Sequence, residues 1–265
     1  MNSIKTKISN ASISSEPFPH LVIDELLDKS DFEKLKNNVN FCLNKDSESL
    51  DESEVLRKAL DTSILDRDEM INKLSETLFS SEIKNSLINK FKSSRKPFSK
   101  NVELISSRPL LVYNPKISKR TSPREPHFDP QYSYLTWLFY IKDEADEYTK
   151  VHLYNYKNGF KGFDYSVEDK MYIKQDSIVL NKSIEAIPNR FFAFLVDERS
   201  VHSVSERKVN SGVRAYLTGG ITSKNNKKIY FPFKSLSLKD KLIFIILRPI
   251  QRIKFKIRSL FYKRS

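Results

Sequence analysis

Two histidines and one aspartate in this chain have the types and the spacing that a transition-metal site needs. His127 and Asp129 are two residues apart, and His202 follows 75 residues after the first histidine. Residues i and i+2 of an extended strand point to the same face, so His127 and Asp129 can bind one ion together. Two imidazoles and one carboxylate hold non-haem Fe(II) on one face and leave its other positions open. These three residues are therefore the candidate metal ligands and catalytic centre.

Segments typical of β-strands flank these candidate ligands. They are rich in aromatic and β-branched residues and are bounded by Pro, Asn, Asp, Ser and Gly. Short strands that follow one another without intervening helices predict an antiparallel sandwich or barrel. The expected strands cover residues 102–106, 108–113, 134–141, 151–156, 171–173, 177–180, 191–196, 201–204 and 213–221.

The N-terminal part of the chain has a different pattern. Residues 1–15 are polar and rich in serine, which indicates a flexible arm, and residues 17–24 have the pattern of an entry strand. Apolar residues at helical spacing then predict helices at residues 30–42, 55–60 and 68–91. Helices followed by a β-rich remainder make the expected fold α+β, with the helices packed on the barrel.

The composition excludes several classes of site. Only five glycines occur in 265 residues, well below the usual share of about 7%, so neither a Rossmann nor a P-loop phosphate site is expected. The single cysteine, Cys42, excludes an internal disulfide and a cysteine-based zinc cluster, and its simplest interpretation is a buried helix residue. The N-terminal segment lacks the pattern of a signal peptide, so the chain is expected in the cytoplasm.

The basic charge of the chain is concentrated at its C-terminal end. Residues 224–265 hold 13 lysines and arginines and one acidic residue, which accounts for +12 of the total net charge of +13. Residues 1–223 carry the remaining +1. We therefore expect a nearly neutral main domain at residues 16–223 and a basic C-terminal appendage at residues 224–265.

The basic appendage has the pattern of an amphipathic helix. Apolar residues recur at steps of three and four between residues 238 and 262, with lysines and arginines around them, and Pro249 would kink or break the segment. Such a helix can lie on an anionic membrane surface, or it can pack on the barrel with its lysines in solvent. Both interpretations stay open. Nucleic-acid binding is a third, weaker alternative because no recognised motif is present.

Taken in order, these segments resemble the 2-oxoglutarate/Fe(II)-dependent oxygenase superfamily, in its prolyl-hydroxylase-like branch. The resemblance covers roughly residues 17–221. Pro17-Phe-Pro-His-Leu-Val-Ile-Asp24 is similar to the usual opening of that branch, and His127-Phe-Asp129 matches its His-x-Asp motif. Residues 135–142 look like the strand that follows, and Ser200-Val-His202 is similar to the approach to the distal histidine.

The resemblance implies a fold and a set of cofactors. The fold is a distorted double-stranded β-helix, a jelly-roll-like barrel with the N-terminal helices packed on it. Fe(II) is held by the three candidate ligands, 2-oxoglutarate and dioxygen take the open positions, and ascorbate serves as reductant. Arg214 matches the arginine that binds the distal carboxylate of 2-oxoglutarate, because its planar guanidinium fits a carboxylate with two hydrogen bonds.

Four further residues are expected in the 2-oxoglutarate pocket. Residues at steps of two on a strand share one face, so the hydroxyl groups of Thr136 and Tyr140 would line the pocket with Leu138 between them. Tyr113 would contribute from the preceding strand. Trp137 and Phe139 alternate with these residues and are expected in the core on the other side of the strand.

The resemblance also implies a reaction. Halogenating branches lack the carboxylate ligand, so Asp129 favours hydroxylation of a substrate, or a related oxidation, coupled to the conversion of 2-oxoglutarate to succinate and carbon dioxide. Peptidyl proline, a free amino acid, a glycan and a lipid all stay open as substrates. Two departures alter the expected pockets: residues 147–154 lack the usual glycine, and Tyr216 stands where Ser or Thr is common.

A non-catalytic function is the alternative that the sequence leaves open. In that case the β-barrel is a binding module, and the basic appendage docks it on a membrane surface or on nucleic acid.

Overall fold

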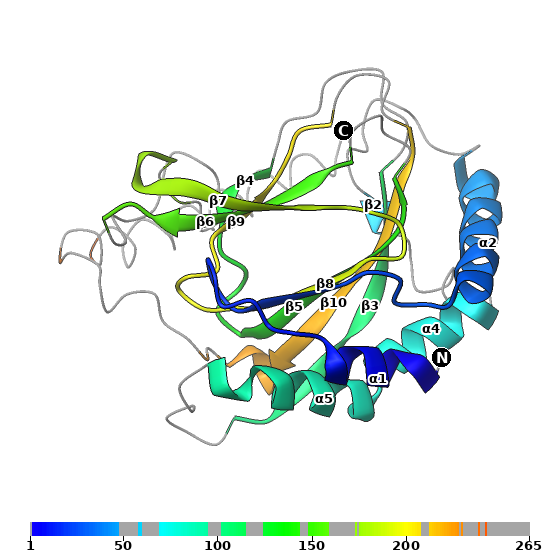
Figure 1. Cartoon of the computed structure of the whole chain (residues 1–265), viewed down its shortest axis with the longest axis horizontal. Helices are drawn as coiled ribbons and strands as arrows, with labels where there is room; N and C mark the ends of the chain where they lie inside the picture. The colour runs from blue at the N-terminus through cyan, green and yellow to red at the C-terminus, as the bar shows by residue number, and fades with distance from the viewer. Residues whose placement is uncertain are drawn as a thin grey trace, which may run out of the picture.

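In the described part of the computed structural model, the α-helices lie in the N-terminal part of the chain and most strands follow them (Figure 1). The helices are α1 (Asn2–Asn10), α2 (Lys29–Ser47), α4 (Glu69–Phe79) and α5 (Ser81–Phe91). The strands are β1 (His20–Ile23), β2 (Lys58–Ala59), β3 (Leu104–Asn114), β4 (Arg124–His127), β5 (Ser133–Asp143), β6 (Lys150–Tyr156), β7 (Ile178–Glu185), β8 (Phe191–Leu195), β9 (His202–Val204) and β10 (Arg214–Ser223). The structure describes residues 2–47, 58–59, 69–94, 102–114, 124–143, 148–158, 173, 175–207, 212–227, 229, 238 and 242.

The strands form two antiparallel sheets that face each other. The larger sheet has the order β1-β8-β5-β10-β3-β2, and the smaller sheet has the order β4-β9-β6-β7. The helices lie on the outer side of the larger sheet, which separates them from the smaller sheet (Figure 1). This is the double-stranded β-helix, and the predicted α+β fold with helices packed on a jelly-roll-like barrel is confirmed.

The central strand β5 divides the apolar residues between two cores. Trp137 and Phe139 belong to the core between the helices and the larger sheet. Tyr140 belongs to the second core, inside the barrel, and Leu138 packs against it. β5 pairs with β8 over Leu135–Phe139 and with β10 on its other side, so its side chains in this part of the strand alternate between the two faces. The predicted division of these four residues between two faces of the strand is confirmed, and the pocket role expected of Leu138 and Tyr140 stays a prediction.

The prediction of a flexible arm at residues 1–15 is wrong, because residues 2–10 form the helix α1. Ile4 and Ile8 lie one helical turn apart and are completely buried in the helix-side core. Lys90 of α5 donates a hydrogen bond to the carbonyl of Ser9 over 2.6 Å, and Lys5 pairs with Glu82 of α5 over 2.5 Å. Packing on α5 therefore holds a helix that is too short and too polar to be stable alone.

Three other predicted boundaries also differ from the structure. The helix expected at residues 68–91 is broken at Ser80, whose hydroxyl accepts a hydrogen bond from the Ile83 amide and so caps α5. The pair of strands expected at residues 102–113 is one continuous strand, β3. Residues 58–59, expected in a helix, form β2 and pair with β3, so a tertiary contact decides their conformation.

Gly220 lies where β10 approaches β5 too closely for a side chain. A Cβ atom at this position would overlap the carbonyl oxygen of Leu135, which is part of the backbone and cannot rotate away. We expect Gly220→Ala to lower the free energy of unfolding by about 1–3 kcal/mol, measured by urea denaturation. Thr222→Ala, on the same strand, is the control and should change it by less than about 0.5 kcal/mol. Equal stability of Gly220→Ala and the wild type would contradict this packing.

His20 makes the stability of the fold depend on pH. Burial lowers the pKa of this imidazole below 6.5, the carbonyl of Phe18 opposes the shift, and the Lys182 ammonium adds to it. The unfolded chain therefore takes up a proton as the pH falls through 6.5, whereas the folded protein does so only at lower pH. Stability is thus fully present above pH 6.5 and is lost below it.

Replacement of His20 by glutamine should weaken this dependence on pH. We expect urea midpoints measured at pH 7.5 and pH 5.5 to differ less in His20→Gln than in the wild type. When the wild-type imidazole becomes protonated, it loses its contact of 3.5 Å with the Lys182 ammonium. Glutamine does not titrate, so it undergoes no such loss. An unchanged difference between the two pH values would assign the acid sensitivity to other groups.

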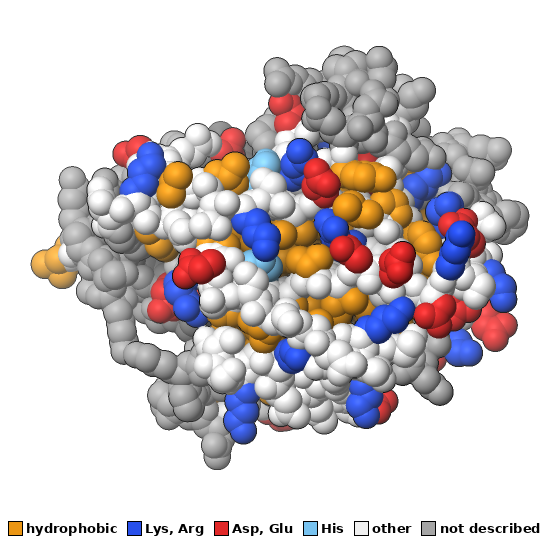
Figure 2. All heavy atoms as spheres, in the orientation of Figure 1, with side chains coloured by type: hydrophobic (Ala, Val, Ile, Leu, Met, Phe, Trp, Pro, Cys, Tyr) orange, Lys and Arg blue, Asp and Glu red, His pale blue; other side chains and the backbone are white. Residues whose placement is uncertain are grey.

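One face of the described surface has no single dominant charge. On the face seen in Figure 2, basic and acidic side chains are interspersed around hydrophobic ones, as expected for a nearly neutral main domain. The amphipathic helix predicted between residues 238 and 262 lies outside the described residues, apart from the exposed Leu238 and Leu242. None of the helices in the described part of the chain has the length and apolar character that crossing a bilayer needs.

Candidate metal centre

The three candidate ligands meet at one point on the smaller sheet. His127 ends β4 and His202 begins β9, and the two are direct partners across the antiparallel ladder. Asp129 follows two residues after the end of β4. One donor atom from each of the three residues can be chosen so that all lie within 4.8 Å of one another. The predicted convergence is therefore present, with Asp129 in the segment without regular structure just beyond β4.

The hydrogen bonds of the two imidazoles fix which nitrogen faces the aspartate. Nδ1 of His127 lies 2.8 Å from the carbonyl oxygen of Glu125, and Nδ1 of His202 lies 2.9 Å from that of Ser200. A carbonyl oxygen only accepts, so each Nδ1 carries a proton, and in the neutral imidazole each Nε2 then keeps its lone pair. Metal-binding histidines are held in this way in proteins, with one nitrogen donating to a carbonyl and the other free for the metal.

The carboxylate of Asp129 faces both Nε2 atoms. Its Oδ1 lies 4.0 Å from Nε2 of His127 and 3.7 Å from Nε2 of His202. Its other oxygen, Oδ2, accepts a hydrogen bond of 2.5 Å from the hydroxyl of Thr136. All three ligands are buried. Three convergent nitrogen and oxygen donors of this kind suit a divalent transition metal, and two imidazoles with one carboxylate are the set typical of non-haem Fe(II).

A short turn that sequence reasoning missed sets the position of His202. The hydroxyl of Ser200 donates to the carbonyl of Asp197 over 2.8 Å and accepts from its amide over 3.1 Å. Arg199 holds the Asp197 carboxylate with a salt bridge of 2.6 Å. The turn in this way fixes the Ser200 carbonyl that orients His202. Asp and Ser three residues apart are a local turn signal. This signal could have been recognised as important only because it lies directly before a candidate ligand.

Aromatic rings pack closely around the distal ligand. The ring centroids of His127 and His202 are 4.4 Å apart, and the ring of Phe194, on β8, lies 4.7 Å from that of His202. Phe194 belongs to the core inside the barrel. The imidazole of His202 is thus held between a second ligand and a buried phenyl ring, which restricts its rotation and keeps water from that side.

Arg214 is a buried cation on the larger sheet. It begins β10 and is only 4% exposed. Its guanidinium carbon lies 4.6 Å from the ring centre of Tyr216 and 5.7 Å from that of Tyr140, which partly compensates the buried charge. Its Nε has no hydrogen-bond partner among the described residues. Because an unsatisfied buried cation is costly, this site suits an anionic ligand.

Tyr140 supplies a second unsatisfied donor next to Arg214. Its side chain is fully buried, and its hydroxyl lacks a hydrogen-bond partner among the described residues. Burial raises the pKa of this phenol well above its ordinary value, and the nearby Arg214 only partly opposes the shift. The hydroxyl therefore keeps its proton and can donate it to an acceptor. A carboxylate would satisfy both Arg214 and Tyr140.

The other predicted pocket residues have different positions. Leu138 packs against the core inside the barrel, on the same face as Tyr140. Thr136 lies on that face too, but its hydroxyl donates to Asp129, so it contacts a candidate metal ligand directly. The backbone of Tyr113 lies on β3 opposite Ala215 of β10, and its side chain lies outside the described residues.

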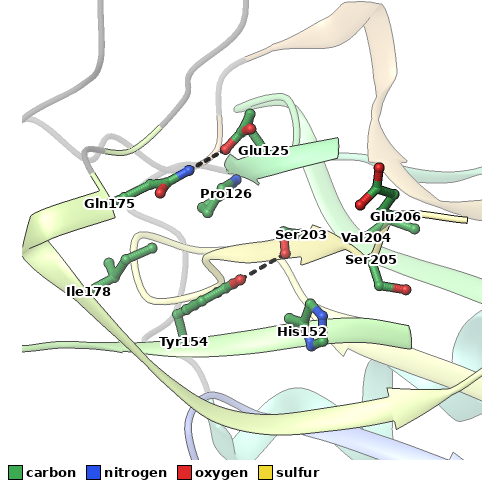
Figure 3. A pocket seen from close by; sticks show the side chains of 10 residues that line it. All are labelled: Glu125, Pro126, His152, Tyr154, Gln175, Ile178, Ser203, Val204, Ser205 and Glu206. Carbon is green, nitrogen blue, oxygen red and sulfur yellow. Dashed lines mark hydrogen bonds between the residues drawn. The ribbon is translucent and has the colours of Figure 1, made fainter. Parts of the chain in front are cut away.

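A hollow of about 330 Å³ lies on the smaller sheet, and its lining includes Pro126 and Ser203, the chain neighbours of two candidate ligands (Figure 3). Ser203 alternates with His202 on β9, so it turns away from the metal centre, and its hydroxyl bonds that of Tyr154 over 2.9 Å. Gln175 donates to the Glu125 carboxylate over 2.5 Å. None of the candidate ligands lines this hollow. Its contacts instead brace β4 and β9.

Comparisons with known proteins bear on the fold. No protein-family model and no curated protein sequence matches the chain. Among solved structures, the epimerase SnoN in complex with Fe3+, alpha ketoglutarate and nogalamycin RO is similar with a TM-score of 0.50 and 12% identity, over 83% of this chain and 82% of that one.

Two prolyl 4-hydroxylases also match. That from Phytophthora capsici gives a TM-score of 0.48 and 13% identity, over 95% of this chain and 72% of that one. That from Pseudomonas putida gives 0.44 and 10%, over 84% of this chain and 98% of that one. The likeness to the SnoN complex, at 12% identity, shows a shared fold alone, so the chemistry rests on the residues of the site.

Proposed function

We propose that this protein is an Fe(II)- and 2-oxoglutarate-dependent dioxygenase that hydroxylates its substrate. The observation that carries the proposal is the convergence of two Nε2 lone pairs and one carboxylate oxygen inside a double-stranded β-helix. The buried and unsatisfied donors of Arg214 and Tyr140 give independent support, because they fit the carboxylate of 2-oxoglutarate.

Each residue has a defined part in this reaction. His127, Asp129 and His202 would hold the iron through three donor atoms. When bound, iron would let dioxygen oxidise 2-oxoglutarate and the substrate together. 2-Oxoglutarate would lose carbon dioxide and take one oxygen atom to become succinate, and the substrate would take the other oxygen atom as a hydroxyl group. Arg214 and Tyr140 would fix the distal carboxylate of 2-oxoglutarate, which orients its 2-oxo group toward the ligands.

The barrel interior contributes by keeping water out. Phe194 shields His202 on one side, and Leu138 offers an apolar surface next to Tyr140 for the methylene groups of 2-oxoglutarate. An apolar environment also strengthens the ion pair between Arg214 and a bound carboxylate, because the local dielectric constant is low.

Release of succinate from 2-oxoglutarate tests the proposal. Protein supplied with Fe(II), 2-oxoglutarate, ascorbate and air should form succinate slowly without any substrate, since uncoupled turnover needs only the cosubstrate. Zn(II) can take the same three ligands but has no redox chemistry, so the zinc-loaded protein is the control and should form none. Equal succinate in both samples, or none with iron although 2-oxoglutarate binds, would favour the non-catalytic module.

A further inference from the structure

The hydroxyl of Thr136 divides the roles of the two oxygens of Asp129. It donates to Oδ2 over 2.5 Å, at the short end of the range for a hydroxyl that donates to a charged oxygen. Oδ1 is left facing Nε2 of His127 and of His202, at 4.0 and 3.7 Å. The two oxygens of one carboxylate therefore have separate partners, one a hydroxyl and the other the histidine pair.

The position of this hydroxyl is fixed by the larger sheet. Thr136 lies in the middle of β5, opposite Phe194 of β8 and Gly220 of β10. Strand neighbours on both sides hold its backbone, and β-branching leaves its side chain few rotamers. Asp129, in contrast, lies in a segment without regular structure after β4. The rigid partner of this pair is Thr136, so the threonine positions the aspartate.

We infer that Thr136 is a positioning residue that keeps Asp129 a one-oxygen metal ligand. The inference rests on the proposed function. A carboxylate can bind a metal through one oxygen or through both, and a hydrogen bond that occupies Oδ2 favours the first mode. Three protein ligands that each give one atom leave three of six positions open. A second aspartate oxygen would take one of the positions that 2-oxoglutarate and dioxygen need.

This role differs from the one expected from the sequence. A threonine that contacts 2-oxoglutarate affects the cosubstrate and leaves metal binding unchanged. A threonine that holds Asp129 affects the metal before any cosubstrate is present. Binding of Co(II) alone to the metal-free protein therefore separates the two roles, and it requires no turnover.

The experiment uses three variants of the full-length chain. Thr136→Val keeps the shape but removes the hydroxyl, and Thr136→Ser keeps the hydroxyl. Thr218→Val is the matched control, because the Thr218 hydroxyl donates to the carbonyl of Trp137 over 3.2 Å on the neighbouring strand. We expect calorimetry to give an affinity for Co(II) that is about 10- to 100-fold lower in Thr136→Val. Thr136→Ser and Thr218→Val should stay near the wild type.

A second measurement needs only the wild type. In the infrared difference between the cobalt-loaded and the metal-free protein, a carboxylate bound through one oxygen has a wider separation of its two stretching bands than one bound through both. We expect the wide separation for Asp129, identified by its loss in Asp129→Asn. The narrow separation would overturn the inference even if Thr136→Val fails to fold.

The possible results separate this inference from the proposed function. If the wild type binds Co(II) and Thr136→Val binds it equally well, the inference is wrong and the proposed function stands. If Thr136→Val loses affinity only for 2-oxoglutarate, the threonine is a cosubstrate contact and the inference is also wrong. If the wild type binds no divalent metal, the inference and the proposed function are both wrong.

Discussion

Substitution of His202 by alanine is expected to abolish the charge-transfer band that Fe(II) and 2-oxoglutarate give together without oxygen. Alanine removes one of three donor atoms that lie within 4.8 Å of one another, and two protein ligands hold a divalent ion far less well than three. Loss of an outer contact to a ligand already costs about 10- to 100-fold in affinity, so loss of the ligand itself should exceed roughly 100-fold. Absorption spectra of the anaerobic mixture measure the result.

His152→Ala provides the matched control for this experiment. His152 lies in the same sheet, opposite Ser203 of β9, and bonds the hydroxyl of Ser183 over 2.8 Å. It is not one of the convergent donors, so its variant should keep the band. An undiminished band in His202→Ala would remove this residue from the metal site. Equal loss in both variants would show that the sheet, and not the ligand set, had been damaged.

The regular part of the fold could be predicted from sequence because its signals are local. Alternation along β5 separates Trp137 and Phe139 from Leu138 and Tyr140, and the structure has the same division. The prediction succeeds because β5 is central and paired on both sides. These four side chains therefore face either the core between the helices and the larger sheet or the core inside the barrel. The spacing of the expected strands also predicted the barrel. In this barrel β4 pairs with β9, which brings together His127 and His202, two residues distant in the sequence.

Features that depend on tertiary contacts were missed. The only strongly apolar residues of the helix α1 are Ile4 and Ile8. Their burial depends on the packing of α1 against α5, which the local sequence does not indicate. The contact between Thr136 and Asp129 depends on the path of the chain after β4. The polar sequence around residue 199 gave no indication that an Arg199–Asp197 pair would secure the turn before His202. Long-range geometry, rather than residue type, decides each of these.

Substitution of Arg214 by methionine is expected to weaken 2-oxoglutarate binding and to leave metal binding unchanged. The guanidinium is the buried cation proposed to receive the distal carboxylate, and it contributes hydrogen bonds between charged groups. Such bonds are worth about 1.5–3 kcal/mol, and a loss of 2–3 kcal/mol corresponds to roughly 30- to 150-fold in affinity. Calorimetric titration of the zinc-loaded protein with 2-oxoglutarate measures the change, and Co(II) affinity serves as the internal control.

The same substitution should not destabilise the ligand-free protein. Arg214 is 4% exposed and its Nε lacks a partner among the described residues, so folding pays to bury it. Contact with the rings of Tyr216 and Tyr140 offsets part of this cost. Methionine fills a similar space without charge. We therefore expect Arg214→Met to have a ligand-free Tm equal to or above that of the wild type.

These opposite effects separate a ligand-binding arginine from a structural one. At a 2-oxoglutarate concentration of about 100 times the wild-type Kd, binding stabilises the protein by about 2.7 kcal/mol. After a roughly 100-fold loss of affinity it stabilises by only about 0.4 kcal/mol. Arg214→Met should thus lose the rise in Tm that 2-oxoglutarate causes, and Arg214→Lys, which keeps the charge but not the planar fork, should retain part of it. A lower ligand-free Tm with an undiminished rise would make Arg214 a packing residue, and the pocket for 2-oxoglutarate would have to lie elsewhere.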